Sequence, residues 1–214
     1  MGAKGFPLAA GGQTPAPWDP IVQAQWTSLV TAWGDKFDSH DLVTNIGMWL
    51  GGKAFECFFA DTPEDATSLN ALGGGSLWLS GAKALLTAFD AFPSTPGSIA
   101  AGNVASDGNK TMTDLYNYMI SEWGGGTIQS NALSAGFPSG TTFPHTNLDC
   151  SQIGSIGFQL LQPMGNPAMA GTTLAQVLAN ALRVKAQWVQ VYVNDPSSDP
   201  GEASIINFNK AVGA

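Results

Sequence analysis

The chain has 214 residues, of which 44% are hydrophobic and only 11% are charged, and its formal net charge is −8. This length suffices for one sizeable core, and the acidic balance argues against a nucleic-acid partner, because nothing in the sequence indicates a basic surface that would neutralise phosphates. No apolar run approaches the roughly 20 residues of a membrane span, so membrane insertion is excluded as well. The N-terminal segment lacks the apolar core of a signal peptide, so we expect either an intracellular chain or a mature or re-engineered form. A sequence this poor in charge is typical of extracellular proteins, and we favour an extracellular or cell-surface location.

The first predicted element after the N-terminus is a long helix. Residues 1–17 are rich in Gly, Ala and Pro and predict an irregular arm, which a single domain over residues 18–214 follows. Asp19 is the expected N-cap of the helix, with Pro20 at its first position, which is a favoured arrangement. The apolar residues that follow at helical spacing, and that we expect to face the core, are Val22, Trp26, Leu29, Val30, Trp33 and Phe37.

Strands and helices alternate along the rest of the chain. Apolar and β-branched runs predict strands at 42–50, 97–104, 127–133, 156–164 and 188–195. Helical patterns predict five further helices. One begins at Thr62-Pro63, two cover 76–92 and 110–123, one begins with Thr172 or Thr173 as N-cap, and the last covers 203–212. The helix at 110–123 has an unbroken apolar face, formed by Met112, Leu115, Tyr116, Met119, Ile120 and Trp123. The later capped helix is expected to bury Leu174, Val177, Leu178, Ala181 and Val184.

This alternation predicts an α/β fold in which parallel strands alternate with helices. The segment QWVQVYVNDPSSDPG (187–201) illustrates the pattern, because it follows the preceding helix without a break. In a βαβ unit the helix packs back on the sheet and a short connection leads into the next strand. The loop at the carboxyl end of that strand then lies where α/β folds place their chemistry.

Two segments resemble parts of (β/α)8-barrel glycoside hydrolases. DPIVQAQWTSLVTAWGDKFDSHDLVTNIGMWLGG resembles the segment in which a helix with a Trp-Gly-Asp-Lys-Phe-like turn precedes the fourth strand, and TLAQVLANALRVKAQWVQVYVNDP resembles the closing helix-strand unit. The resemblance covers about residues 18–212 and implies the C-terminal part of such a barrel, with the predicted strands as strands four to eight. We therefore expect a partial or atypical TIM-barrel-like architecture with about five βα units, where a full barrel has eight strands in about 250 residues. Open strand edges would then favour a homo-oligomer or an assembly.

The resemblance also implies a pair of catalytic carboxylates at the ends of the fourth and seventh strands. Glu56 follows the first predicted strand and is the candidate acid/base; the alternative is a surface Glu beside an aromatic cluster. At the seventh-strand candidate Gln162 stands where the second carboxylate is expected, and an amide cannot act as the nucleophile. Asp195, with Asp199 near it, is the substitute candidate after the last strand, and the alternative is that Asp195 belongs to a turn.

Further candidates concern substrate binding. Trp49, at the carboxyl end of the first predicted strand, is the candidate sugar platform, because aromatic faces stack on the apolar faces of sugar rings. Asn103, Asn131 and Gln162 on the later strands are the other candidate substrate-binding residues. The remaining tryptophans have structural interpretations: we expect Trp26, Trp33, Trp78 and Trp123 in the core, and Trp188 at the opposite rim.

The two cysteines leave two alternatives open. Cys57 and Cys150 form a disulfide in an oxidising compartment, or they are two buried free thiols. His145, with Asp149 and Cys150 near it, could ligate a metal, but no second cluster completes a tetrahedral set. No phosphate-binding or dinucleotide-binding glycine motif is present, so we expect neither a metal nor a cofactor.

Two functions follow as hypotheses. The first is a carbohydrate-active or carbohydrate-binding protein with Glu56 and Trp49 on the active rim, hydrolysing by acid/base chemistry if it is an enzyme. The alternative is a non-catalytic structural or self-assembling extracellular protein built on a barrel-like scaffold. A third and weaker hypothesis is a small flavodoxin-like domain, which would bind its ligand where the strand order reverses.

Overall fold

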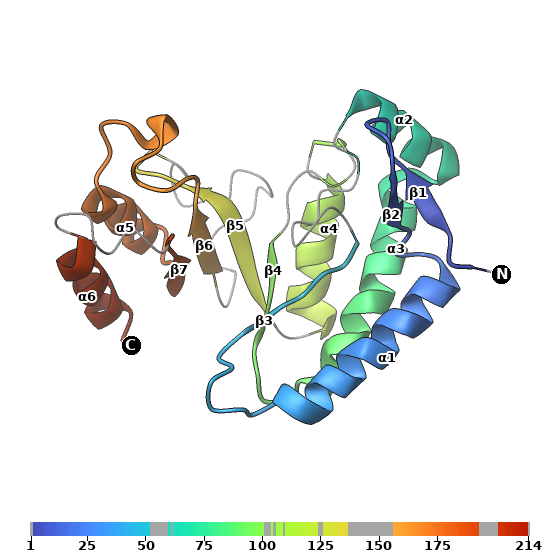
Figure 1. Cartoon of the computed structure of the whole chain (residues 1–214), viewed down its shortest axis with the longest axis horizontal. Coiled ribbons are helices and arrows are strands. Elements are labelled where there is room, and N and C mark those ends of the chain that lie inside the picture. The colour runs from blue at the N-terminus through green and yellow to red at the C-terminus, as the bar shows by residue number, and fades with distance from the viewer. Residues whose placement is uncertain are drawn as a thin grey trace. The chain divides into compact units, whose positions relative to one another are not determined.

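The chain has the expected α/β fold in a computed structural model (Figure 1). Two compact units, Met1–Gly126 and Thr127–Ala214, make up the chain and are described separately. The described residues are 2–51, 60, 62–100, 104, 106–108, 110–123, 126–136, 156–192 and 201–213. Among them, no helix is long and apolar enough to span a membrane. The single domain expected over residues 18–214 stays a prediction.

The first unit opens with a short antiparallel hairpin, where the sequence predicts an irregular arm. Strand β1 (Gly5–Pro7) pairs with β2 (Gln13–Pro15), and Phe6 and Thr14 are buried partners in this pair. Gly11 and Gly12 in the turn have φ values of +88° and +83°, a conformation that glycine adopts without strain. The backbone N–H of Ala9 donates to Asp65 Oδ1 at 2.7 Å, which ties the hairpin to the helix α2 (Pro63–Leu72).

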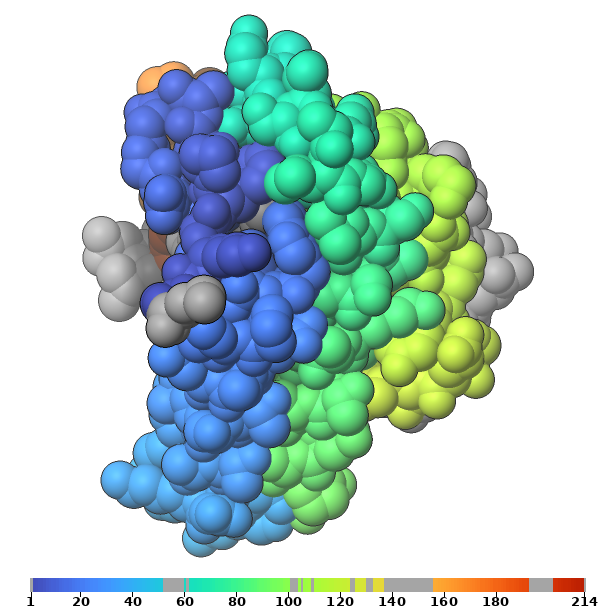
Figure 2. Space-filling view, turned by 90° about the vertical axis from the view of Figure 1, so that its right-hand side faces the viewer, coloured from blue at the N-terminus to red at the C-terminus, as the bar shows by residue number. Residues whose placement is uncertain are grey.

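Three helices lie side by side on one face of this unit (Figure 2). They are α1 (Pro20–Phe37), α3 (Gly74–Thr87), which continues into the 3-10 turn η1 (Ala88–Ala91), and α4 (Lys110–Tyr118), which continues into the π-helical turn η2 (Met119–Trp123). The shorter α2 (Pro63–Leu72) precedes α3. The caps read from the sequence are confirmed, since Asp19 accepts from the N–H groups of Ile21 and Val22, and Thr62 accepts from that of Asp65.

A parallel strand pair completes the first unit. Strand β3 (Ile46–Gly47) pairs with β4 (Gly97–Ala100), with Ile46 opposite Gly97. Both strands lie inside predicted runs, although β3 has only two residues. Trp78, Leu85, Leu86 and Ile99 are fully buried, so the core lies between the helices and this pair.

The expected buried face of α1 is partly wrong. Val22, Val30 and Gly34 are buried, whereas Leu29 and Trp33 are 42% and 38% exposed. The buried residues of α1 are spaced four or eight residues apart and therefore form one ridge along the helix. This ridge packs against the neighbouring elements. Leu29 and Trp33 each stand one residue earlier than this row, about 100° round the helix, and face outward.

The expected face of the helix at 110–123 is also correct only in its first part. Met112, Leu115, Tyr116 and Met119 are buried, but Ile120 is 43% exposed and Trp123 is half-buried. The π-helical turn η2 explains the difference, because its wider turn rotates the positions after Met119 away from the 3.6-residue pattern.

The described part of the second unit contains three parallel strands and two helices. Strand β6 (Ile156–Leu160) pairs with β5 (Thr127–Leu133) on one side and with β7 (Trp188–Gln190) on the other. The helices are α5 (Leu174–Arg183) and α6 (Gly201–Val212), and a short 3-10 turn η3 (Pro167–Met169) precedes α5. Thr173 rather than Thr172 caps α5, and every residue expected to face inward from this helix is buried.

Candidate functional site

Most of the site residues predicted from the sequence lie outside the described residues. These are Glu56, Cys57, Asn103, Cys150 and Asp195. Asn131 belongs to β5, but its side chain is outside the description as well. The roles assigned to these residues stay predictions. Among the residues that the structure describes, no cluster of His, Cys, Asp and Glu could hold a metal ion.

Two of the predicted site residues are described, one in each unit. Trp49 is half-buried after β3 and packs edge-to-face on Trp26, with ring centroids 5.0 Å apart. Trp26 also contacts Trp33 and Phe89, so Trp49 belongs to an aromatic cluster on α1 and η1. In the second unit, Gln162 follows β6 and accepts a hydrogen bond from Asn166 Nδ2 at 3.4 Å.

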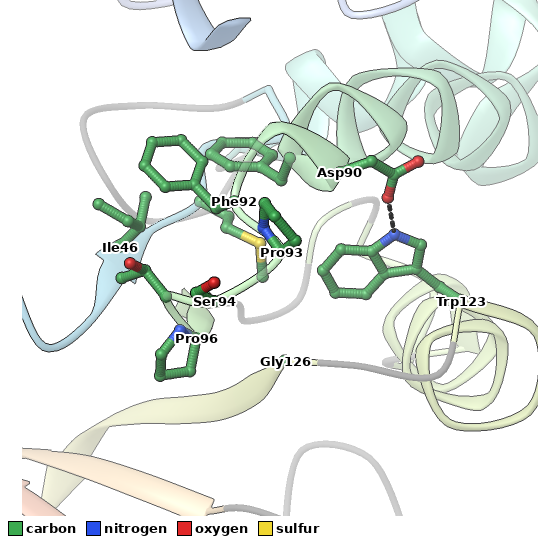
Figure 3. Close-up of a pocket in the computed structure, with 12 residues that line it drawn as sticks. Ile46, Asp90, Phe92, Pro93, Ser94, Pro96, Trp123 and Gly126 are labelled. Carbon is green, nitrogen blue, oxygen red and sulfur yellow. Dashed lines mark hydrogen bonds between the residues drawn. The ribbon is translucent and has the colours of Figure 1, made fainter. Parts of the chain in front are cut away.

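A pocket of about 480 Å³ opens in the first unit at the amino ends of β3 and β4 (Figure 3). This volume falls within the roughly 300–1,000 Å³ typical of small-molecule sites. Half of its lining comes from the segment 92–97 that leads into β4, and Ile46, the first residue of β3, adds to it. The twelve lining residues are Ile46, Met48, Phe89, Asp90, Phe92, Pro93, Ser94, Thr95, Pro96, Gly97, Trp123 and Gly126.

The floor of the pocket is apolar and closely packed. Met48, Phe89 and Phe92 are 2%, 3% and 8% exposed. Two glycines leave room for the Met48 side chain: a Cβ atom on Gly97 would stand 3.0 Å from Met48 Cε, and one on Gly126 would stand 3.3 Å from it. Gly126 also has a φ of +83°, so both space and backbone conformation favour glycine there.

The rim of the pocket carries an acidic and aromatic pair. The indole N–H of Trp123 donates to Asp90 Oδ1 at 2.9 Å, which holds the ring at one side of the pocket, while Ile46, Ser94 and Pro96 lie on the other side (Figure 3). Asp90 and Ser94 are exposed, and Trp123 is half-buried. Within the described part of the chain, nothing donates to Asp90 Oδ2, so this oxygen remains available as an acceptor.

A hydrogen-bonded link from α1 holds the segment that lines the pocket. Asp38 Oδ1 accepts from the backbone N–H groups of Ser94 and Thr95 at 3.1 Å and 2.8 Å. In return, the N–H of Ser39 donates to Thr95 Oγ1 at 3.1 Å. Desolvation raises the pKa of Asp38, but the hydrogen bonds from Thr95 and Ser94 together outweigh it, and the net effect lowers the pKa.

These groups suit ligand binding better than hydrolysis. Asp90 is the only carboxylate among the twelve lining residues, and none of them is a His, Cys, Lys or Arg. Glycoside hydrolysis ordinarily requires two carboxylates, and the lining residues supply only one of them. The pocket also lies at the opposite end of the strands from the edge where α/β enzymes place catalysis.

Sequence reasoning missed this pocket because its two main residues had structural interpretations. Trp123 was expected in the core, and Asp90 stands in a helical pattern that Pro93 ends. A signal was nevertheless present in the segment Phe92-Pro93-Ser94-Thr95-Pro96-Gly97, since two prolines before a strand indicate a rigid irregular connection.

No family model, no curated protein and no solved structure matches the chain.

Proposed function

We propose that the chain binds carbohydrate and that the pocket at the amino ends of β3 and β4 is its sugar site. The observation that carries the proposal is the hydrogen-bonded pair of Trp123 and Asp90 on the rim. An indole held in place offers a face to the C–H groups of a sugar ring, since the π face carries partial negative charge. The free oxygen of Asp90 and the Ser94 hydroxyl can pair with sugar hydroxyls.

The proposal is tested by replacing Trp123. We expect Trp123→Ala to raise the dissociation constant for a bound oligosaccharide at least about tenfold, because the stacking surface is lost. Isothermal titration calorimetry with cellotetraose, xylotetraose, mannotetraose and the glucosamine tetramer measures this. Trp33→Ala is the matched control, since Trp33 is 38% exposed and does not line the pocket. Equal binding by both variants, or no binding by the wild-type chain, would contradict the proposal.

The finer architecture and hydrolysis are further proposals, made beside the sugar site. A partial barrel that resembles the C-terminal part of glycoside hydrolases is supported by strands that begin inside the predicted runs and pair in parallel within each unit. Hydrolysis would rest on Glu56 and Asp195, which the sequence places after predicted strands, at the opposite strand ends from the pocket, so it is a proposal separate from sugar binding there. The low share of charged residues supports an extracellular or cell-surface location.

A second candidate function is self-assembly as a structural protein. The observation that favours it is the exposed apolar surface on α1, where Leu29 and Trp33 face outward. Large apolar side chains that gather on a surface often mark an interaction site. A homo-oligomer built through this surface would be compatible with sugar binding, because neither residue lines the pocket.

A further inference from the structure

We propose that the pocket selects an amino sugar, with the protonated amine of the ligand placed between Asp90 and the Trp123 ring. This inference rests on the proposed carbohydrate function and names the ligand class of that same pocket. The geometry points to Asp90 as the residue that determines specificity.

The first argument for an amino sugar is the charge of the residues that line the pocket. Asp90 is the only charged side chain among the twelve lining residues, and its Oδ2 atom has no donor within the described part of the chain. The other nearby carboxylate, on Asp38, already accepts the N–H groups of Ser94 and Thr95. Among the twelve lining residues Asp90 thus supplies the only charge and no side chain is cationic, so a cationic ligand complements this lining and an anionic sugar is repelled.

The second argument is the position of the Trp123 indole ring beside Asp90. Its N–H group is bound to Asp90 Oδ1, so the ring cannot turn without breaking this bond, and it stays next to the carboxylate. A cation beside the face of a Trp ring is attracted by its electron-rich surface. An ammonium group on a sugar can therefore meet the carboxylate and the ring together, whereas a hydroxyl group at the same position makes only a neutral hydrogen bond.

The test compares two tetramers that share one skeleton and linkage, the glucosamine tetramer and cellotetraose. At about pH 6 we expect a sugar amine to be protonated, since a comparable amine, the α-amino group of a polypeptide, has a pKa of about 7.7–8.0 and is charged there. We expect the wild-type chain to bind the amino sugar about tenfold tighter than cellotetraose, because charge-assisted hydrogen bonds are stronger than neutral ones. Calorimetry at constant ionic strength measures both affinities.

Asp90→Asn is the decisive variant, because the amide oxygen can still accept the indole N–H while the charge is removed. We expect this variant to bind both tetramers with similar affinity and to keep its wild-type unfolding temperature. Glu64→Gln makes the same change in net charge on α2, outside the pocket. The helix α3, about 21 Å long from its 14 residues, separates α2 from η1. Glu64→Gln should therefore keep the preference for the amino sugar.

Each outcome decides between the proposals. Equal affinity of the wild-type chain for both tetramers, with binding lost in Trp123→Ala, would overturn the inference and leave the sugar site in place. If Asp90→Asn and Glu64→Gln reduce the preference for the amino sugar equally, the preference comes from the net charge of −8 and not from Asp90. This result would also overturn the inference. If neither tetramer binds, or Trp123→Ala binds as the wild-type chain does, the proposed function itself fails for these ligands.

Discussion

Asp38, at the end of α1, joins this helix to the segment that leads into β4. It accepts hydrogen bonds from the backbone N–H groups of Ser94 and Thr95, which lie 56 and 57 residues later in the chain. Those two residues also line the pocket, so a single carboxylate on the end of α1 positions part of the pocket wall. The link is reciprocal, since Ser39 donates back to Thr95. Ser39 has a φ of +61°, which is uncommon for a residue with a side chain and indicates that this turn is held by its contacts.

We expect Asp38→Ala to lower the thermal unfolding midpoint at neutral pH. The folded pKa of Asp38 lies below its ordinary value of 3.8, so its stabilising effect is present above that pH and is lost as the pH falls through the folded pKa. The difference in midpoint between the wild-type chain and Asp38→Ala should therefore shrink below about pH 3.8. Calorimetric scans across this range measure it. Asp35→Ala removes an exposed carboxylate from the same helix and serves as control; a difference that stays constant with pH would count against the link.

At the scale of elements, the close approach of α1 to η1 positions the pocket rim. Gly34 makes the approach possible, because an added Cβ atom would stand 2.7 Å from the Cβ of Ala91 and overlap its carbonyl oxygen. The turn η1 carries Asp90 and leads directly into the segment that lines the pocket. Packing between two helical elements thus determines where the acidic group of the rim stands.

We expect Gly34→Ala to reduce the free energy of unfolding by roughly 1–3 kcal/mol, the usual cost of overpacking. Alanine ordinarily stabilises a helix interior by about 1 kcal/mol relative to glycine, so the sign of the result tests the contact with Ala91. Gly47→Ala is the control, because no described residue other than its chain neighbours has an atom within 4 Å of the added Cβ. Denaturant unfolding measures both variants. A gain in stability for Gly34→Ala would show that α1 and η1 do not meet closely.

At the scale of the whole molecule, negative charge opposes association and exposed apolar surface favours it. The net charge is −8, while Leu29, Trp33 and Leu42 are 42%, 38% and 87% exposed. In the sheet of parallel strands, β3 stands at one end of the described order, so one of its edges has no described strand beside it. Such an edge invites pairing with another chain.

We expect a concentration-dependent oligomer whose mass increases with salt, because salt screens the repulsion between acidic chains. Light scattering over a dilution series measures the mass at low and high ionic strength. The double variant Leu29→Gln, Trp33→Gln should shift the chain toward the monomer. Leu182→Gln with Ile206→Gln removes a comparable pair of exposed apolar residues from the second unit and should leave the mass unchanged. A monomer at every concentration, or an equal response of both double variants, would contradict this prediction.

The sequence by itself determined the α/β class, the order of the elements after residue 17, two helix starts, and a third start to within one residue. Asp19 with Pro20, Thr62 with Pro63, and Thr173 act through atoms within a few residues, so their effect is local and can be read from spacing. The burial of Val177, Leu178 and Ala181 follows in the same way from a regular 3.6-residue period.

Only the tertiary structure decided where the pocket lies and which aromatic residues reach its rim. Asp90 and Trp123 are 33 residues apart, and their hydrogen bond depends on how η1 packs near the end of η2. The π-helical turn places Trp123 off the buried face, and the packing of α1 along one ridge leaves Trp33 exposed. These outcomes depend on contacts between distant elements and on a departure from regular helix geometry, neither of which a periodic pattern encodes.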